Sequence, residues 1–180
     1  MNILFLHGKL STPETSHSAL AIKTFFTAKG MTVFIPDYKP NDSSKQEIEQ
    51  FLNSYIKDNN ILADDTAIIG ISLGGYWALN TANKKYFEMS LDDFKCILLN
   101  PALDYYDDAI YPVNDLPVTC FLNEDDELLD SHKTYDYLKS RCNCKLFKTG
   151  GHRMSNINEL LPEIEKSVCG FVPSGVTNDW

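Results

Sequence analysis

The sequence predicts an α/β fold, with a doubly wound and mainly parallel sheet of about six strands and helices on both faces. Three observations carry this prediction. Short apolar runs of strand length alternate with longer segments whose apolar residues recur at helical spacing. Glycine, proline or asparagine closes most of these segments. The chain of 180 residues also has the length of one domain with a substantial core.

The expected strands are short apolar runs that end at turn-forming residues. The first run ends at His7-Gly8, the second before Pro36, and the fourth at Asn100-Pro101. In chain order, strands are expected at residues 3–7, 32–35, 66–71, 94–99, 118–122 and 145–147.

The expected helices fill the segments between these strands. The first stops at Gly30, and the second has one apolar face with Ser43 or Ser44 as its cap. In chain order, helices are expected at residues 16–29, 44–59, 73–85, 131–141 and 154–168. The connection 101–116 lacks a clear helix and is rich in tyrosine, so a functional loop and a plain crossover both fit it.

Composition and charge limit the domain bounds, the binding partners and the location that we expect for the protein. Residues 1–169 are expected to form the domain, and 170–180 an irregular tail. Asp and Glu number 25 against 16 Lys and Arg, and the resulting net charge of −9 repels nucleic acid and anionic lipid. The N-terminus lacks a signal pattern and no apolar stretch could span a bilayer, so we expect a cytoplasmic protein that binds neither nucleic acid nor membrane.

The five cysteines are expected to be reduced thiols, because no secretory signal accompanies them. Cys142 and Cys144 flank Asn143 and would face the same side of a strand. Zinc binding would need a second ligand pair with matching spacing, which the sequence lacks. We therefore expect two small buried apolar side chains, and no metal.

The strongest local signal is Gly-Ile-Ser-Leu-Gly-Gly at residues 70–75, between an apolar strand and an amphipathic helix. A nucleophile on such a sharp turn projects its side chain above the sheet edge. The backbone around the nucleophile is crowded, so the residues two positions before it and two positions after it must be small. Gly70 and Gly74 occupy these positions. The helix N-terminus favours a developing oxyanion. Ser72 is thus the candidate nucleophile, and a capping serine in a tight turn is the plainer alternative.

A serine nucleophile needs a base, and this fold orders the triad as serine, acid, histidine. His152 follows two glycines and precedes the last helix, which is the position of a base. His17 and His132 fall on expected helices instead.

The acid comes from residues 124–127, Glu-Asp-Asp-Glu, where all four carboxylates are candidates. Asp126 is favoured because Leu128 and Leu129 follow it and tuck the turn beneath a helix, and Asp125 ranks second.

The oxyanion hole needs one N–H from the residue after the nucleophile, Leu73, and one from the loop after the first strand. Gly8 permits close approach there, so Lys9 is the expected second donor and Leu10 the alternative. The residues expected to contact substrate are His7, Gly8, Leu10, Asn100 and Tyr105.

In this order, the motifs resemble the YqiA-type esterases, which are small bacterial α/β-hydrolases without a lid domain. The matching segments are residues 6–8, 11–13, 70–78, 100–102, 126–130 and 150–152. The resemblance implies a minimal α/β-hydrolase fold and hydrolysis of carboxylic esters or thioesters with short acyl chains. It also favours Asp126 over Asp125. The sequence departs from the family at Lys9, where a large apolar residue is usual, and over residues 14–19.

The sequence therefore predicts a serine hydrolase that acts on a small acyl ester or thioester through an acyl-enzyme and uses no cofactor. Tyr105, Tyr106 and Tyr111 could narrow the acyl pocket. One alternative is a binding or scaffold protein that keeps the fold but has weak or no turnover. Another is a peptidase, a lactonase or a perhydrolase, because fold and triad do not separate these reactions.

Overall fold

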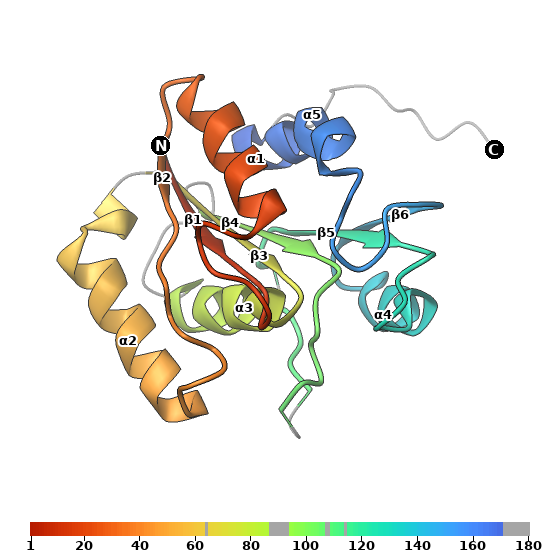
Figure 1. The fold of residues 1–180 in the computed structure, drawn as a ribbon, viewed down its shortest axis with the longest axis horizontal. Helices are drawn as coiled ribbons and strands as arrows, with labels where there is room; N and C mark the ends of the chain where they lie inside the picture. Colours follow the sequence, from red (N-terminus) through yellow and green to blue (C-terminus); the bar gives the residue numbers. More distant parts are fainter. Residues whose placement is uncertain (64, 87–93, 107–108, 114, 171–180) are drawn as a thin grey trace.

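The computed structural model describes residues 1–63, 65–86, 94–106, 109–113 and 115–170 (Figure 1). Within these residues, six strands form one wholly parallel sheet in the order β2-β1-β3-β4-β5-β6. The strands are β1 (Asn2–Leu6), β2 (Thr32–Phe34), β3 (Thr66–Ile71), β4 (Phe94–Leu99), β5 (Val118–Asn123) and β6 (Asn143–Phe147). The helices are α1 (His17–Thr27), α2 (Lys45–Asp58), α3 (Leu73–Lys85), α4 (Ser131–Leu138) and α5 (Ile157–Cys169), with a 3₁₀ turn η1 (Ile61–Ala63).

Helices cover both faces of the sheet, α1 and α5 on one and α2, α3 and α4 on the other (Figure 1). Phe5 and Phe26 lie in the first apolar layer, and Trp77 and Leu98 in the second. Strand β3 is buried along its whole length, as expected for a central parallel strand. The predicted doubly wound parallel sheet is confirmed. The apolar layers on its two faces hold the strands in place, so that their carboxyl ends form one well-defined edge.

The winding of the sheet reverses at β1, because β2 lies on one side of it and β3 on the other. Leu6 at the end of β1 is in register with Gly70 near the end of β3. The loops that leave these two strands therefore meet at one point on the carboxyl edge. Such a reversal point is where open α/β sheets bind ligands.

Two element boundaries differ clearly from the prediction. The last helix begins at Ile157 rather than 154, because Met154 has a left-handed φ of 54° and cannot lie in an α-helix. The helix expected to reach 141 ends at Leu138, whose carbonyl accepts from the N–H groups of Arg141 and Cys142 in a tight turn. The expected tail lies outside the described residues from 171 onward, and the described part of 101–116 contains no helix.

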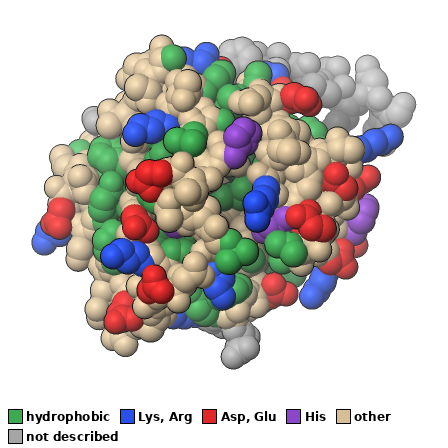
Figure 2. All heavy atoms as spheres, viewed as in Figure 1, with side chains coloured by type: hydrophobic (Ala, Val, Ile, Leu, Met, Phe, Trp, Pro, Cys, Tyr) green, Lys and Arg blue, Asp and Glu red, His purple; other side chains and the backbone are tan. Residues whose placement is uncertain are grey.

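Acidic and basic side chains are interspersed on the face seen in Figure 2. No helix among the described residues is long and apolar enough to cross a membrane.

Candidate active site

Ser72 lies alone between β3 and α3, in a backbone conformation that side chains rarely adopt. Its φ is 55° and its ψ is −123°, which places strain at this residue. Ser72 N–H donates to the Leu99 carbonyl of β4 (3.0 Å), and Ser72 O accepts from Ala102 N–H (3.0 Å). The side chain makes no cap hydrogen bond to α3. The turn is thus held through its backbone, and Oγ is left for other partners.

Glycines on either side of Ser72 permit this turn. A Cβ on Gly70 would lie 2.1 Å from the Gly74 carbonyl oxygen, and one on Gly74 would lie 2.0 Å from the Leu6 carbonyl oxygen. Both distances are far inside van der Waals contact, so helix α3 approaches β1 and β3 this closely only with glycine at both positions.

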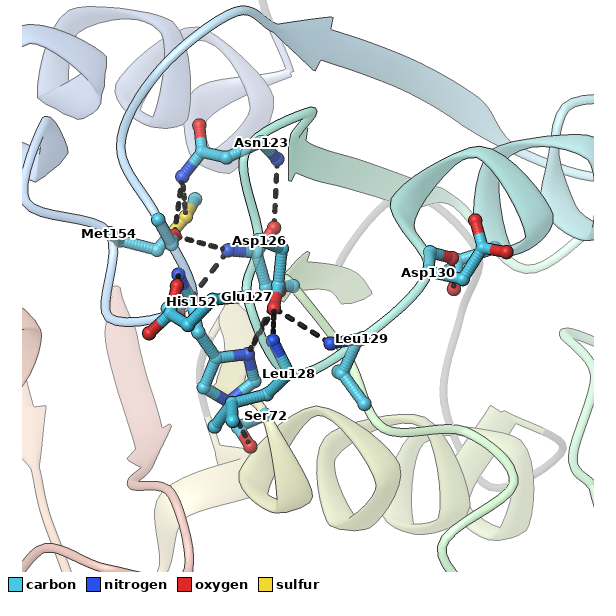
Figure 3. Close-up of polar contacts among 12 residues, drawn as sticks. Ser72, Asn123, Asp126, Glu127, Leu128, Leu129, Asp130, His152 and Met154 are labelled. Carbon is cyan, nitrogen blue, oxygen red and sulfur yellow. Dashed lines mark hydrogen bonds and ion pairs between the residues drawn. The ribbon is translucent and has the colours of Figure 1, made fainter.

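Ser72, His152 and Asp126 form a continuous hydrogen-bonded chain (Figure 3). Ser72 Oγ lies 2.8 Å from His152 Nε2, and His152 Nδ1 lies 2.8 Å from Asp126 Oδ2. A carboxylate can only accept, so Nδ1 carries the proton and Nε2 accepts from the serine hydroxyl. This is the arrangement in which a neutral imidazole can take the serine proton.

Asp126 is held as a buried carboxylate. Its side chain is 1% exposed, and Oδ1 accepts from the N–H groups of Leu128 and Leu129, both at 2.8 Å. Burial acts to raise the pKa of Asp126, but the hydrogen bonds from His152, Leu129 and Leu128 outweigh it and the pKa is lowered. The group therefore remains ionised and can orient the imidazole.

The two neighbouring acids bind the backbone of the histidine turn instead. Asp125 accepts from Gly151 N–H (2.8 Å) and Gly150 N–H (3.1 Å). Glu127 accepts from His152 N–H at 2.9 Å. Asp125, the second-ranked acid, thus points at the turn and Asp126 at the ring.

Buried asparagines at the ends of β4 and β5 support the same turn. Asn100 donates to the carbonyls of Gly151 (2.9 Å) and His152 (3.3 Å) and accepts from Asn123 N–H (2.9 Å). Asn123 donates to Gly151 O at 3.0 Å and accepts from Asn156 at 2.9 Å. The Asn100 side chain was expected to contact substrate, but it is 1% exposed and its amide is fully engaged. We propose that it positions the histidine turn instead.

The sequence did not predict that Glu127, Asn123 and Asn156 would support the turn that carries His152. A polar residue at the end of a buried strand was the available signal for Asn123, as it was for Asn100. Glu127 and Asn156 carry no such signal.

The loop after β1 brings the expected oxyanion donors to the serine. A Cβ on Gly8 would lie 3.4 Å from Ser72 Cβ, so the amide of Lys9 begins next to the nucleophile. Ser11 caps the turn by donating to Gly8 O from both its N–H (3.3 Å) and its hydroxyl (3.1 Å). Leu73 is the first residue of α3, and the first amides of a helix lack intrahelical acceptors. Leu73 N–H therefore lies beside the serine, and we propose that Lys9 N–H is the second oxyanion donor.

His7 supports this loop from beneath. Its side chain is fully buried, and its ring lies tilted against the Tyr38 ring at a centroid distance of 4.7 Å. Its Nδ1 lies 2.9 Å from Gly8 O. Burial lowers the pKa of His7, so the ring is neutral and donates from Nδ1. Substrate contact was expected here, but we propose that His7 fixes the loop.

Two of the side chains expected to contact substrate are exposed. Leu10 is 78% exposed and Tyr105 43%. Lys9 Nζ donates to Tyr105 OH at 2.5 Å, which joins the loop after β1 to the segment after β4. Leu128 was expected to tuck the acid turn beneath a helix, but its side chain is 64% exposed. The backbone N–H groups of Leu128 and Leu129 hold the turn instead, because both donate to Asp126 Oδ1.

Fold and site together define a class: the chain has the α/β-hydrolase fold. Est1E from Butyrivibrio proteoclasticus matches with a TM-score of 0.70 at 16% identity, over 94% of this chain and 88% of that one. A Xanthomonas campestris protein described as an α/β serine hydrolase without a lid matches with a TM-score of 0.65 at 14% identity, over 97% and 84%. The expected α/β-hydrolase fold is therefore confirmed, and the described residues contain no separate lid domain.

Within this class, the chain belongs to the UPF0227 family, described as "Uncharacterised protein family", whose model matches residues 2–112. This is the YqiA family, so the resemblance seen in the motifs is confirmed. A UPF0227 protein of Shewanella sp. (strain ANA-3) is 24% identical over 184 residues, which cover 91% of this chain and 97% of that protein. The family model covers Ser72, whereas Asp126 and His152 lie beyond its match.

Proposed function

We propose that the protein is a serine hydrolase that cleaves carboxylic esters or thioesters with short acyl chains through an acyl-enzyme. The observation that carries this proposal is the chain from Ser72 Oγ through His152 to Asp126, with 2.8 Å at both steps. Its strained serine turn supports the same conclusion, because backbone strain of this kind collects at functional sites. The α/β-hydrolase fold is consistent with this chemistry.

In the proposed mechanism, His152 Nε2 takes the Ser72 proton as Oγ attacks the carbonyl carbon. The N–H groups of Leu73 and Lys9 stabilise the oxyanion. His152 then protonates the leaving alcohol or thiol, and later activates the water that releases the acid. Asp126 keeps the imidazole in the required tautomer throughout. Each proton thus has a donor and an acceptor within the chain or in water.

We propose that the Lys9–Tyr105 bridge forms one wall of the acyl site. Lys9 follows Gly8, which lies against Ser72, and Tyr105 lies three residues after Ala102, which bonds Ser72 O. The wall is therefore short and anchored at both ends next to the nucleophile. Exposed Leu10 and Leu128 supply apolar surface at the rim. A short wall with an open rim suits a small acyl group.

Labelling with a fluorophosphonate probe tests the proposal, because the probe reacts with an activated serine. We expect one adduct on the peptide that contains Ser72, in native protein and not in denatured protein. Ser72→Ala should abolish the adduct, whereas Ser11→Ala, the nearby serine that caps the loop, should retain it.

Absence of labelling in folded wild-type protein would contradict the proposal and favour a binding or scaffold role. A parallel panel of aryl esters, acyl thioesters, lactones and peptides separates the reaction types. Turnover confined to lactones or peptides would retain the nucleophile but overturn the ester assignment.

A further inference from the structure

Four of the five cysteines lie in or just before the three neighbouring strands β4, β5 and β6. Cys96 and Cys120 lie in the apolar layer beneath α3 and α4, and Cys142 and Cys144 pack against the same layer. The tight turn after α4 brings the last two together, with their sulfurs 3.5 Å apart. Both are half-buried, so the expectation of two buried side chains was wrong. This turn ends α4 early and leaves both thiols only partly covered.

The surroundings make one of these thiols the more acidic. Cys144 is in register with Cys120 on the neighbouring strand β5. Hydrogen bonds from Cys120 and Cys142 lower the pKa of Cys144, although partial burial opposes them. Cys142 Sγ also lies 3.6 Å from the Leu138 carbonyl, to which its thiol can donate. The hydrogen bond with Cys144 and burial together raise the pKa of Cys142. These shifts make Cys144 the more acidic thiol of the contacting pair.

We propose that Cys142 and Cys144 are a redox-reactive pair that a peroxide oxidises to a Cys142–Cys144 disulfide. Reactive cysteines of this kind combine thiolate character, solvent access and an adjacent resolving thiol. The sulfurs are 3.5 Å apart and must approach to about 2.05 Å to form the bond. Cys120 is fully buried, which leaves Cys142 as the accessible resolving partner.

The chemistry balances with one peroxide for each disulfide. The Cys144 thiolate attacks one peroxide oxygen, the O–O bond breaks, and the leaving oxygen takes a proton to form water or alcohol. Cys144 is then a sulfenic acid. The Cys142 sulfur attacks the Cys144 sulfur, the S–O bond breaks, and the hydroxide leaves with the Cys142 proton as water. Two thiols lose two electrons in total, and the peroxide gains them.

The geometry does not favour a metal site at this pair. Across the described part of the chain, no group of three or more His, Cys, Asp or Glu side chains has the arrangement of a metal site. Two contacting sulfurs with a single acidic thiol fit thiol oxidation better than tetrahedral zinc ligation, which takes four ligands.

Peptide mapping of the intact, folded protein tests the inference. The protein is treated with limiting hydrogen peroxide, its remaining thiols are blocked with N-ethylmaleimide, and it is digested with trypsin without reduction. Cleavage after Arg141 and Lys145 places both cysteines in the peptide 142–145. We expect this peptide to lack two hydrogen atoms and to carry no maleimide, while untreated protein carries two maleimides on it.

Three variants sharpen the assignment. Cys142→Ser should stop oxidation at the Cys144 sulfenic acid, which dimedone traps. Cys144→Ser should give far less dimedone adduct on Cys142. Cys169→Ser, which changes the exposed cysteine at the end of α5, should still form the disulfide and serves as the matched control.

Three results would overturn the inference. One is a peptide 142–145 that stays fully reduced at a peroxide dose that oxidises free N-acetylcysteine. The second is a cross-link between Cys144 and the peptide that carries Cys120. The third is a sulfenic acid that forms first on Cys142 or Cys169.

Discussion

The two sides of the carboxyl edge of this sheet are built in opposite ways. On the histidine side, the turns after β5 and β6 are joined by hydrogen bonds to buried or backbone partners, including those of Asp125, Glu127 and Asn100. On the other side, the loop after β1 and the segment after β4 meet mainly through the exposed Lys9–Tyr105 contact. The histidine side holds in place the groups that would transfer protons. The other side presents exposed side chains that can adapt to different substrates.

The largest expected effect comes from removing Ser72 Oγ, the atom that both sides of the sheet edge surround in the proposed mechanism. Ser72→Ala should lower kcat for a short aryl ester on the order of a million-fold. Without the serine hydroxyl, His152 and Asp126 have no nucleophile to activate. Its fold should persist, since the Ser72 side chain caps nothing in α3. Ester hydrolysis and thermal unfolding measure the two effects. A clean preparation that keeps a tenth of the activity would remove Ser72 from the proposed role.

The next largest effect separates the two neighbouring aspartates of the histidine side. Asp126→Asn should lower kcat roughly ten-thousand-fold, because an amide allows the wrong His152 tautomer. Asp125→Asn keeps a side-chain acceptor for the Gly151 amide and should stay within about tenfold of wild type, the cost of one hydrogen bond. Steady-state kinetics on one ester measures both variants. The reverse ranking would move the acid to Asp125.

The comparison also explains which parts of the site the sequence could predict. Ser72 was recognisable because the strand-to-helix turn demands small neighbours at fixed spacing, and His152 because it follows two glycines before a helix. Asp126 was favoured for the two leucines after it, and the structure brings it together with Ser72 and His152. The leucines act through their backbone N–H groups, however, and the Leu128 side chain is exposed. The sheet followed from the alternation of apolar runs.

The supporting residues were harder to predict, because their roles depend on three-dimensional turn geometry. Glu127 and Asn156 look like surface residues in sequence, and only the path of the histidine turn gives them partners. Met154 adopts a left-handed φ that no local pattern announces. His7 and Asn100 lie at strand ends, where substrate contact was the natural expectation, but both side chains face inward.

A smaller effect tests whether Asn100 positions the histidine turn. Its φ is 39°, so Asn100→Gly removes the amide without adding backbone strain. Two carbonyls and one N–H then lose their buried partner, which should destabilise the fold by about 1–3 kcal/mol. Misplacement of His152 should lower kcat by roughly tenfold to a hundredfold and leave KM nearly unchanged.

The exposed amide of the other side provides the matched control for Asn100. Asn41 donates to the Lys9 carbonyl at 2.7 Å, and Asn41→Gly should change stability by less than about 0.5 kcal/mol. Denaturant unfolding and kcat and KM are measured for both variants. Equal losses of stability in the two would contradict the contrast between the two sides of the sheet edge.

The smallest expected effect concerns acyl length, which the open side should set. Each methylene buried against the wall contributes about 0.8 kcal/mol, or about fourfold in kcat/KM. Beyond the Lys9–Tyr105 bridge, added carbons lie in water and bring no further transition-state binding. We therefore expect kcat/KM to peak at short chains and then flatten or fall.

Tyr105→Ala removes that bridge and should shift the peak toward longer acyl chains by a few carbons, with kcat/KM on acetyl esters changed by less than about tenfold. Tyr111→Ala is the control, because Tyr111 stacks at 4.1 Å on Tyr137 and lies outside the proposed wall. Tyr106 packs edge-on against Tyr76 and Trp77, so we leave it out of the wall as well. Aryl esters from acetyl to palmitoyl supply the profile. A wild-type kcat/KM that rises steadily to palmitoyl would show an extended groove, and a Tyr105→Ala profile identical to wild type would place the wall elsewhere.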